Sequence, residues 1–171
     1  MCINRRDRIK TSLVIADYLN QNHAEDILFL LDKYSCDSMG GGKKLPEVVM
    51  NNLIPKLSKM DGATSIICYV DSAPAGLANC FDAFSTFKCK PVLNIHDLVV
   101  LEGFRGLGLS QQLLNKIEEI AIDKGCCKIT LEVLEGNEIA KKSYKKFGFA
   151  GYELDPKTGK ALFWEKEIFS Q

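Results

Sequence analysis

One segment, from residue 98 to residue 114, constrains the fold of this chain more than any other. It reads LVVLEGFRGLGLSQQLL, an apolar strand followed by a turn with Gly106 and Gly108 and by an amphipathic helix to about Lys124. Glycines here let the backbone approach a ligand, and the unpaired N–H groups of a first helical turn suit phosphate oxygens. Arg105 adds a fixed positive charge. The pattern predicts a phosphate site or, as the alternative, a glycine-rich turn that binds no ligand.

This turn differs from two common nucleotide-binding motifs. It lacks the Gly-Lys-Ser/Thr run of a Walker loop. The residue three beyond Gly108 is Gln111, so the G-x-G-x-x-G dinucleotide pattern is also absent. Both nucleotide-binding classes are therefore disfavoured.

The remaining hydrophobic patterns predict strands and helices on both sides of this segment. Strands are expected over residues 11–19, 64–70, 76–87, 92–101 and 129–134, with helices from a cap at Asn20 or Asn22 to Tyr34, over 46–60 and 108–124, and from a cap at Asn137 to Gly148. A last hairpin is expected to turn at residues 155–159. The order is β-α-α-β-β-β-α-β-α-β-β, and because no repeat or linker appears, residues 1–171 are predicted to form a single mixed α/β domain.

Charge and cysteine content exclude several classes of protein. The 22 basic residues balance 22 acidic ones, so neither a nucleic-acid surface nor an acidic tail is indicated. Apolar runs are far shorter than the roughly 18 residues of a membrane span, and the first ten residues do not resemble a signal peptide. Seven cysteines without a C-x-x-C pair, beside two histidines, predict reduced thiols, a cytoplasmic location and no metal site.

Two motifs in register resemble those of the Gcn5-related N-acetyltransferase superfamily. That family carries Gln/Arg-x-x-Gly-x-Gly/Ala after an apolar strand, and Arg105, Gly108 and Ser110 occupy its three defined positions, with serine in the last. The second motif follows strand 129–134 and comprises Asn137, Ala140, Tyr144 and the run Phe147-Gly148-Phe149. With the surrounding element order, the resemblance covers nearly the whole chain.

The resemblance implies a particular fold and cofactor. A central, mostly antiparallel sheet of six to seven strands, flanked by about four helices, would splay between strands 93–101 and 128–134 around acetyl-coenzyme A. The pyrophosphate would rest on N–H groups near residues 105–110, and the pantetheine arm would pair with β-strand backbone at Leu98 and Val100. The cofactor residues implied in this way are Leu98, Val99, Val100, Arg105, Gly106, Leu107, Gly108, Leu109, Ser110, Asn137, Ala140 and Tyr144.

Acetyl transfer to an amine requires two proton movements. An alkylammonium with a pKa near 10.4 must lose a proton before it attacks, and the leaving thiolate must gain one. Tyr144 matches the family position that often protonates the sulfur, although its helical spacing with Ala140 and Phe147 also suits a core tyrosine.

His96 and Asp97 are the candidate bases. Alternation along the strand places His96 on the face of Leu98 and Val100, with Asp97 on the opposite face. Spermidine/spermine acetyltransferases, which this strand resembles, have glutamate followed by aspartate at the matching positions. Histidine can take the same proton, so His96 is the first choice and Asp97 the second. The alternative for each is a purely structural hydrogen bond.

The resemblance therefore implies an N-acetyltransferase that uses acetyl-coenzyme A and acts on a small primary amine, such as a polyamine or an amino acid. The alternatives are acetylation of a protein lysine or N-terminus, and a noncatalytic acyl-coenzyme A binding domain. Neither a nucleic acid nor a membrane is expected as a partner. A homodimer is an option, because members of the family are often dimers.

Overall fold

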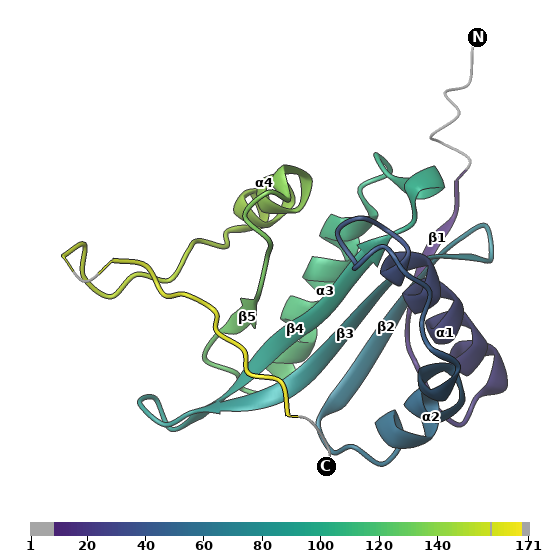
Figure 1. Ribbon diagram of the computed structural model, residues 1–171, viewed down its shortest axis with the longest axis horizontal. Helices are drawn as coiled ribbons and strands as arrows, with labels where there is room; N and C mark the ends of the chain where they lie inside the picture. The colour runs from purple at the N-terminus through teal and green to yellow at the C-terminus, as the bar shows by residue number, and fades with distance from the viewer. Residues whose placement is uncertain (1–8, 158, 169–171) are drawn as a thin grey trace, which may run out of the picture. The chain divides into compact units, whose positions relative to one another are not determined.

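The computed structural model describes residues 9–157 and 159–168 (Figure 1), and the chain divides into two compact units between Leu131 and Glu132. The first unit contains one five-stranded sheet in the order β1-β2-β3-β4-β5. Its strands are β1 (Thr11–Ile15), β2 (Ala63–Val70), β3 (Ala73–Ser85), β4 (Lys90–Val100) and β5 (Ile129–Leu131).

The sheet is mostly antiparallel, as the family resemblance implies. β1 to β4 pair antiparallel with their neighbours along the chain, and only β5 lies parallel to β4. β2 and β3 are joined by Asp71 and Ser72, whose φ angles of 48° and 69° match the left-handed backbone of a tight hairpin turn. The connection is therefore shorter than the five-residue segment expected from the sequence.

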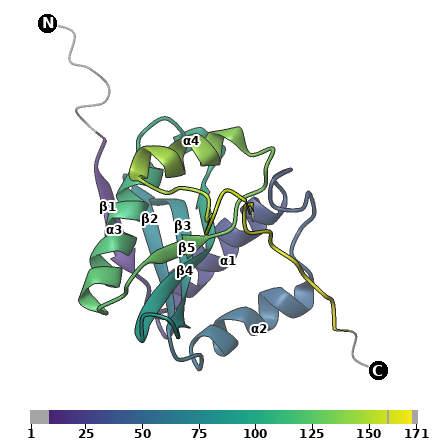
Figure 2. The ribbon, with the colours of Figure 1, turned by 90° about the vertical axis from the view of Figure 1, so that its left-hand side faces the viewer.

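Two helices cover one face of the sheet and one covers the other, as Figure 2 shows. On the first face lie α1 (Gln21–Ser35) and α2 (Glu47–Leu57), and on the second lies α3 (Leu109–Asp123). Asn20 is the N-cap of α1, because its side chain accepts hydrogen bonds from the backbone N–H groups of Asn22 and His23. A short 3-10 helix, Glu102–Phe104, links β4 to the turn before α3.

The apolar stripes of the three helices form the core of the first unit. Beneath α1 and α2, a buried cluster comprises Ile27, Leu30, Ile54, Leu57, Ile67, Leu77 and Val99. α3 buries Leu109, Leu113, Leu114, Ile117, Ile120 and Ala121. Each fully buried side chain of this kind contributes about 1.5–3 kcal/mol, so the core holds β4 and the start of α3 firmly in place.

The second unit contains α4 (Glu138–Phe147). Asn137 caps this helix through its side chain, and Gly148, at a φ of 111°, ends it in the left-handed conformation, as its sequence predicts. Both ends are thus specified by neighbouring residues.

The strand count differs from the prediction. The expected strand 129–134 ends at Leu131, and the expected terminal hairpin is reduced to one isolated bridge between Glu153 and Lys160; Thr158 of its turn lies outside the described residues. The sheet therefore has five strands rather than six to seven. The physical reason is that a two-stranded hairpin needs apolar packing, whereas Leu162 and Trp164 are 72% and 82% exposed.

Candidate functional site

The first feature of the candidate site is an open edge on β4. β5 pairs with β4 only from Leu93 to Ile95, while β4 continues to Val100. Along residues 96–100, the described part of the chain provides a sheet partner, β3, on one side only. Within the first unit, the pairing of β4 with β5 thus stops at Ile95, before the part of β4 at which the family resemblance implies a gap. An open strand edge offers N–H and C=O groups to an extended ligand.

The second feature is the turn that starts α3. Gly106 and Gly108 have φ angles of 81° and 79°, a region that favours glycine. A Cβ atom added at either position would meet nothing within 4 Å, so the backbone faces open space here. The first N–H groups of α3, the dipole of a 15-residue helix and Arg105 together fit a phosphate group.

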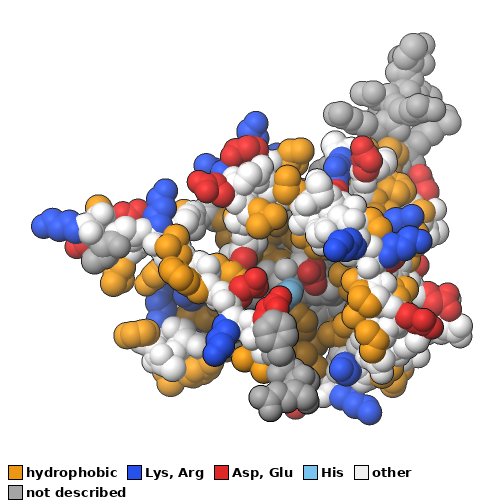
Figure 3. Space-filling view, in the orientation of Figure 1, with side chains coloured by type: hydrophobic (Ala, Val, Ile, Leu, Met, Phe, Trp, Pro, Cys, Tyr) orange, Lys and Arg blue, Asp and Glu red, His pale blue; other side chains and the backbone are white. Residues whose placement is uncertain are grey.

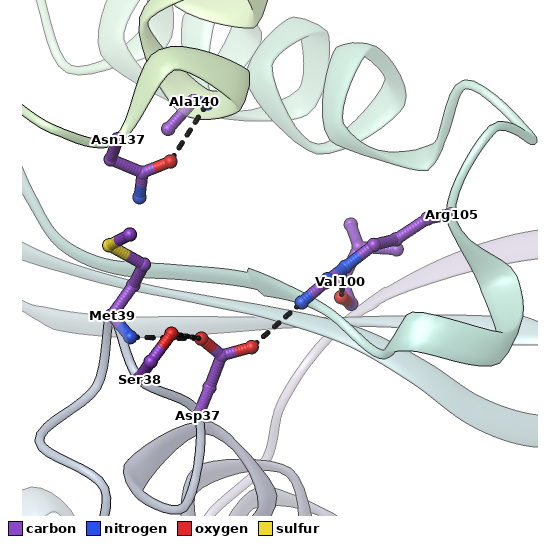
Figure 4. Close-up of polar contacts among 7 residues, drawn as sticks. All are labelled: Asp37, Ser38, Met39, Val100, Arg105, Asn137 and Ala140. Atoms are coloured by element: carbon purple, nitrogen blue, oxygen red, sulfur yellow. Dashed lines mark hydrogen bonds and ion pairs between the residues drawn. The ribbon is translucent and has the colours of Figure 1, made fainter.

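Arg105 ties the open edge to the segment that follows α1 (Figure 4). Its Nε donates to the carbonyl oxygen of Val100 at 3.3 Å, and its guanidinium donates to Oδ2 of Asp37 at 2.9 Å. The other carboxylate oxygen of Asp37 accepts from the backbone N–H of Met39 at 2.9 Å. The Met39 N–H and the guanidinium hold the pKa of the Asp37 carboxyl below its ordinary value. Asp37 therefore stays ionised beside Arg105.

His96 and Asp97 share one face of the sheet, and the prediction that they face opposite sides is wrong. Asn79 pairs with Asp97 and Cys80 with Ile95, so His96 is an extra residue in β4, a β-bulge. The bulge interrupts the strict alternation of side chains along the strand.

Contacts on the two faces confirm this orientation. The ring centroids of His96 and Phe81 are 5.6 Å apart, in an edge-to-face arrangement. Phe81 in turn packs against the buried cluster beneath α1 and α2, which contains Val99. Val100 instead pairs with Gly76, where an added Cβ would meet Leu113 of α3. His96 therefore belongs to the face of Asp97 and Val99, not to that of Leu98 and Val100.

His96 and Asp97 also lie close together and differ in exposure. His96 Nδ1 is 3.5 Å from Asp97 Oδ1, and the two side chains are 66% and 23% exposed. Asp97 Oδ2 accepts a hydrogen bond from Nδ2 of Asn79 at 3.0 Å. The exposed imidazole can reach a ligand, while the carboxylate behind it is held by the sheet.

The second of the two family motifs lies on α4, within the second unit. Asn137 Oδ1 accepts from the backbone N–H of Ala140 at 3.1 Å, so its side chain caps the helix. The half-buried ring of Tyr144 contacts Phe149, with ring centroids 5.8 Å apart. Asn137, Ala140 and Tyr144 thus lie together at α4, whereas the site residues from His96 to Ser110 lie together in the first unit.

Three residues with a place at the site were not singled out from the sequence. They are Asp37, Ser65 and Asn79. Asp37 follows α1 directly before the glycine run, but no local pattern pairs it with Arg105, 68 residues away. Ser65 and Asn79 could have been noticed as polar residues within apolar strands, because a polar residue buried in a core nearly always has a hydrogen-bond partner.

The described residues contain neither a candidate metal site nor a candidate membrane-spanning helix. Among residues 9–157 and 159–168, no group of three or more His, Cys, Asp or Glu side chains is placed to hold a metal ion. Within the same ranges no helix combines the length and apolar character needed to cross a bilayer. Figure 3 shows basic and acidic side chains interspersed over one face, without a broad field of either sign.

A strand with an open edge, followed by a glycine-rich start of a helix, is suited to an extended ligand that carries phosphate groups. Residues 29–149 match the Acetyltransferase (GNAT) family, and the chain belongs to that family. The match runs from the first unit into the second and includes the two motifs. The mixed α/β fold expected from the family resemblance is confirmed.

Two curated relatives of this chain carry the name of an acetyltransferase. Thialysine N-epsilon-acetyltransferase from Bos taurus is 35% identical over 66 residues, which are 39% of this chain and 38% of that protein. The Caenorhabditis elegans protein of that name is 26% identical over 129 residues, 72% of this chain and 74% of its own length. The match thus spans less than half of the bovine relative's length.

Solved structures share the fold at low sequence identity. An integron cassette protein from V. cholerae has a TM-score of 0.74 at 21% identity, with 92% of each chain covered. AAC(6')-Iy in complex with a bisubstrate analog, CoA-S-monomethyl-acetylneamine, has a TM-score of 0.72 at 19% identity, covering 93% of this chain and 99% of that one. These likenesses establish the fold alone.

Proposed function

We propose that this chain is an acetyl-coenzyme A dependent N-acetyltransferase that acts on a primary amine of a small molecule. The observation that carries the proposal is the open edge of β4 from His96 to Val100, which leads directly to the glycine turn and the N-terminus of α3. Membership of the GNAT family supports it. The names of the curated relatives, which act on thialysine, support a small amine as the acceptor.

The chain supplies two kinds of group to hold acetyl-coenzyme A. Backbone groups of residues 98–100 would pair with the pantetheine arm, and the N–H groups of residues 106–110 with Arg105 would hold the pyrophosphate. Asn137, Ala140 and Tyr144 are proposed to contact the same molecule. The bound acetyl-coenzyme A supplies an acetyl thioester as the electrophile.

The side chains proposed to move protons are His96, Asp97 and Tyr144. His96 accepts the proton of the amine, directly or through a water molecule, because its ring is exposed at the open edge. Asp97, which touches the ring, is the second candidate for this role. Tyr144 donates a proton to the leaving sulfur, and the Val100 N–H group is suited to stabilise negative charge on the acetyl oxygen.

The two units are proposed to act as one catalytic domain. Both motifs are needed for the roles above, and the family match runs across the boundary at Leu131 without interruption. We further propose a cytoplasmic location, since the chain carries many unpaired cysteines, of which Cys68 and Cys80 are buried.

The test has two steps. Isothermal calorimetry first measures binding of acetyl-coenzyme A, and turnover is then screened over polyamines, amino acids, aminoglycosides and lysine peptides. Loss of thioester should be followed by chromatography, because the exposed Cys36 and Cys89 would react with thiol reagents. Binding with turnover of a small amine supports the proposal. Turnover of peptides alone, or binding without turnover, contradicts it in favour of a protein acetyltransferase or a noncatalytic domain.

A further inference from the structure

Two polar side chains are buried inside the sheet beneath the site. Ser65 on β2 and Asn79 on β3 are 1% and 4% exposed, and they are the buried polar residues of the described chain. Burying such groups is unfavourable unless each finds a hydrogen-bond partner. Their partners therefore indicate what their presence in the core achieves.

The two residues belong to a chain of hydrogen bonds across three strands. Ser65 Oγ donates to Asn79 Oδ1 at 2.6 Å, and Asn79 Nδ2 donates to Asp97 Oδ2 at 3.0 Å. The hydroxyl of Tyr18 lies 2.9 Å from Ser65 Oγ. Since the single hydrogen of Ser65 is used towards Asn79, Tyr18 is the donor in this contact.

The Asp97 carboxylate fixes the orientation of the Asn79 amide. A carboxylate has only acceptor atoms to offer, so the NH2 group of Asn79 must face Asp97 and the amide oxygen must face Ser65. Ser65 can satisfy that oxygen only by donating its hydrogen to it. Every donor in the series of hydrogen bonds thus points towards Asp97.

The other carboxylate oxygen of Asp97 faces His96. Nδ1 of the imidazole lies 3.5 Å from Oδ1, and the ring is held against the edge of Phe81. Because the carboxylate only accepts, the neutral ring gains most when its proton is on Nδ1. Nε2 is then the basic atom of His96.

We propose that Asn79 is a positioning residue for proton transfer, which holds Asp97 so that His96 carries its proton on Nδ1 and accepts with Nε2. This proposal rests on the proposed function, because it assigns a role to His96 in acetyl transfer. Other titratable groups that interact electrostatically with Asp97 are Tyr34 of α1 and Cys80 of β3, and Tyr34 also interacts with Asp37. None of them takes part in the hydrogen-bond chain that the structure shows.

The experiment measures the tautomer of His96 by long-range 1H–15N NMR of the imidazole nitrogens, without cofactor or acceptor. His23 is an internal control, because its Nδ1 accepts from the backbone N–H of Asp17 at 3.1 Å. Neutral His23 must therefore carry its proton on Nε2, and a His23→Gln variant assigns the two rings. We expect Nδ1–H for His96 and Nε2–H for His23 in the same spectrum.

Two variants then remove the amide. Asn79→Leu keeps a similar volume but has no donor, and Ser65→Ala/Asn79→Leu replaces both buried partners with apolar groups, which protects the fold. In both variants we expect His96 to shift towards the Nε2–H tautomer while His23 stays unchanged. kcat should fall about 10- to 100-fold with an unchanged KM for acetyl-coenzyme A.

The outcomes separate the positioning role from the proposed function. Nε2–H on His96 in the unaltered protein, or an unchanged tautomer in both variants, overturns the positioning role whatever the activity. The expected tautomers without turnover of any amine contradict the proposed function, while the role of Asn79 in setting the tautomer stands.

Discussion

The guanidinium of Arg105 donates to Oδ2 of Asp37 at 2.9 Å, and this ion pair joins the glycine turn before α3 to the segment after α1. The same arginine occupies the first defined position of the family's pyrophosphate motif. The side chain of Arg105 thus connects the turn to which it belongs, and which is proposed to hold the cofactor, with the loop between α1 and α2.

Replacing Asp37 with asparagine tests this ion pair. The variant keeps an oxygen that accepts from Met39 but loses the charge. Exposed ion pairs contribute about 0.5 kcal/mol, so we expect Tm to fall by roughly 1–2 °C at pH 7 and low salt. Because the pKa of Asp37 is lowered in the folded state, its contribution is present above its ordinary pKa and is lost as the pH falls through the lowered value.

The measurement is Tm against pH by circular dichroism. The difference between the two proteins should vanish at acidic pH and shrink with added salt. Asp61→Asn, which removes an exposed carboxylate for which the structure shows no ion pair, is the matched control. A difference that persists at low pH would contradict a charge-based contribution.

Gly108→Ala should weaken the binding of acetyl-coenzyme A. The φ of 79° costs a non-glycine residue about 1–2 kcal/mol, and relief of this strain would shift the N–H groups at the start of α3. We expect affinity to fall by roughly tenfold in calorimetry. Gly103→Ala is the control, because its added Cβ also meets nothing within 4 Å but its φ is not positive. Equal affinity in both variants would remove the glycine turn from the cofactor site.

Tyr144→Phe should lower kcat by roughly 10- to 1000-fold and leave the affinity for acetyl-coenzyme A unchanged, because only the hydroxyl proposed as proton donor is lost. The ring keeps its contact with Phe149, so Tm should not change. Tyr152→Phe, at a tyrosine that is 64% exposed, serves as the control. Unchanged turnover would make Tyr144 a packing residue of α4.

His96→Gln should flatten the acidic limb of the pH profile of turnover and lower its plateau. If His96 is the base, its protonation stops attack on the thioester, so the acidic limb of the unaltered protein should depend on this side chain. His96→Glu should retain more activity than His96→Gln, since a carboxylate can also accept the proton. A limb that persists in His96→Gln and disappears in Asp97→Asn would identify Asp97 as the base.

The cysteines should differ sharply in reactivity. Burial raises the pKa of Cys68 to about 11 and that of Cys80 to about 12, so both remain thiols at pH 8. In a Cys2→Ser background, mass spectrometry after alkylation should find the exposed Cys36 and Cys89 modified first. Rapid modification of Cys68 or Cys80 in the folded protein would contradict the buried sheet.

Much of the local structure could be predicted from the sequence. Gly108 followed by apolar residues at helical spacing predicted α3, Asn137 and Gly148 predicted both ends of α4, and the resemblance built on these residues led to the correct fold class and family. These features depend on residues within one or two turns of each other, because caps, glycine turns and amphipathic stripes act locally.

Other features were decided only in the tertiary structure. The bulge at His96 arises where Asn79 and Cys80 of β3 pair with Asp97 and Ile95, so the facing of His96 depends on the register of β4 against its partner strand. The ion pair of Arg105 needs Asp37, which is 68 residues away in the sequence. The expected terminal hairpin needs apolar packing from other segments and is reduced to a single bridge. Strand register is set by how whole segments pack, and a shift of one residue moves a side chain to the other face of the sheet. Alternation within β4 alone therefore could not determine the face on which His96 lies.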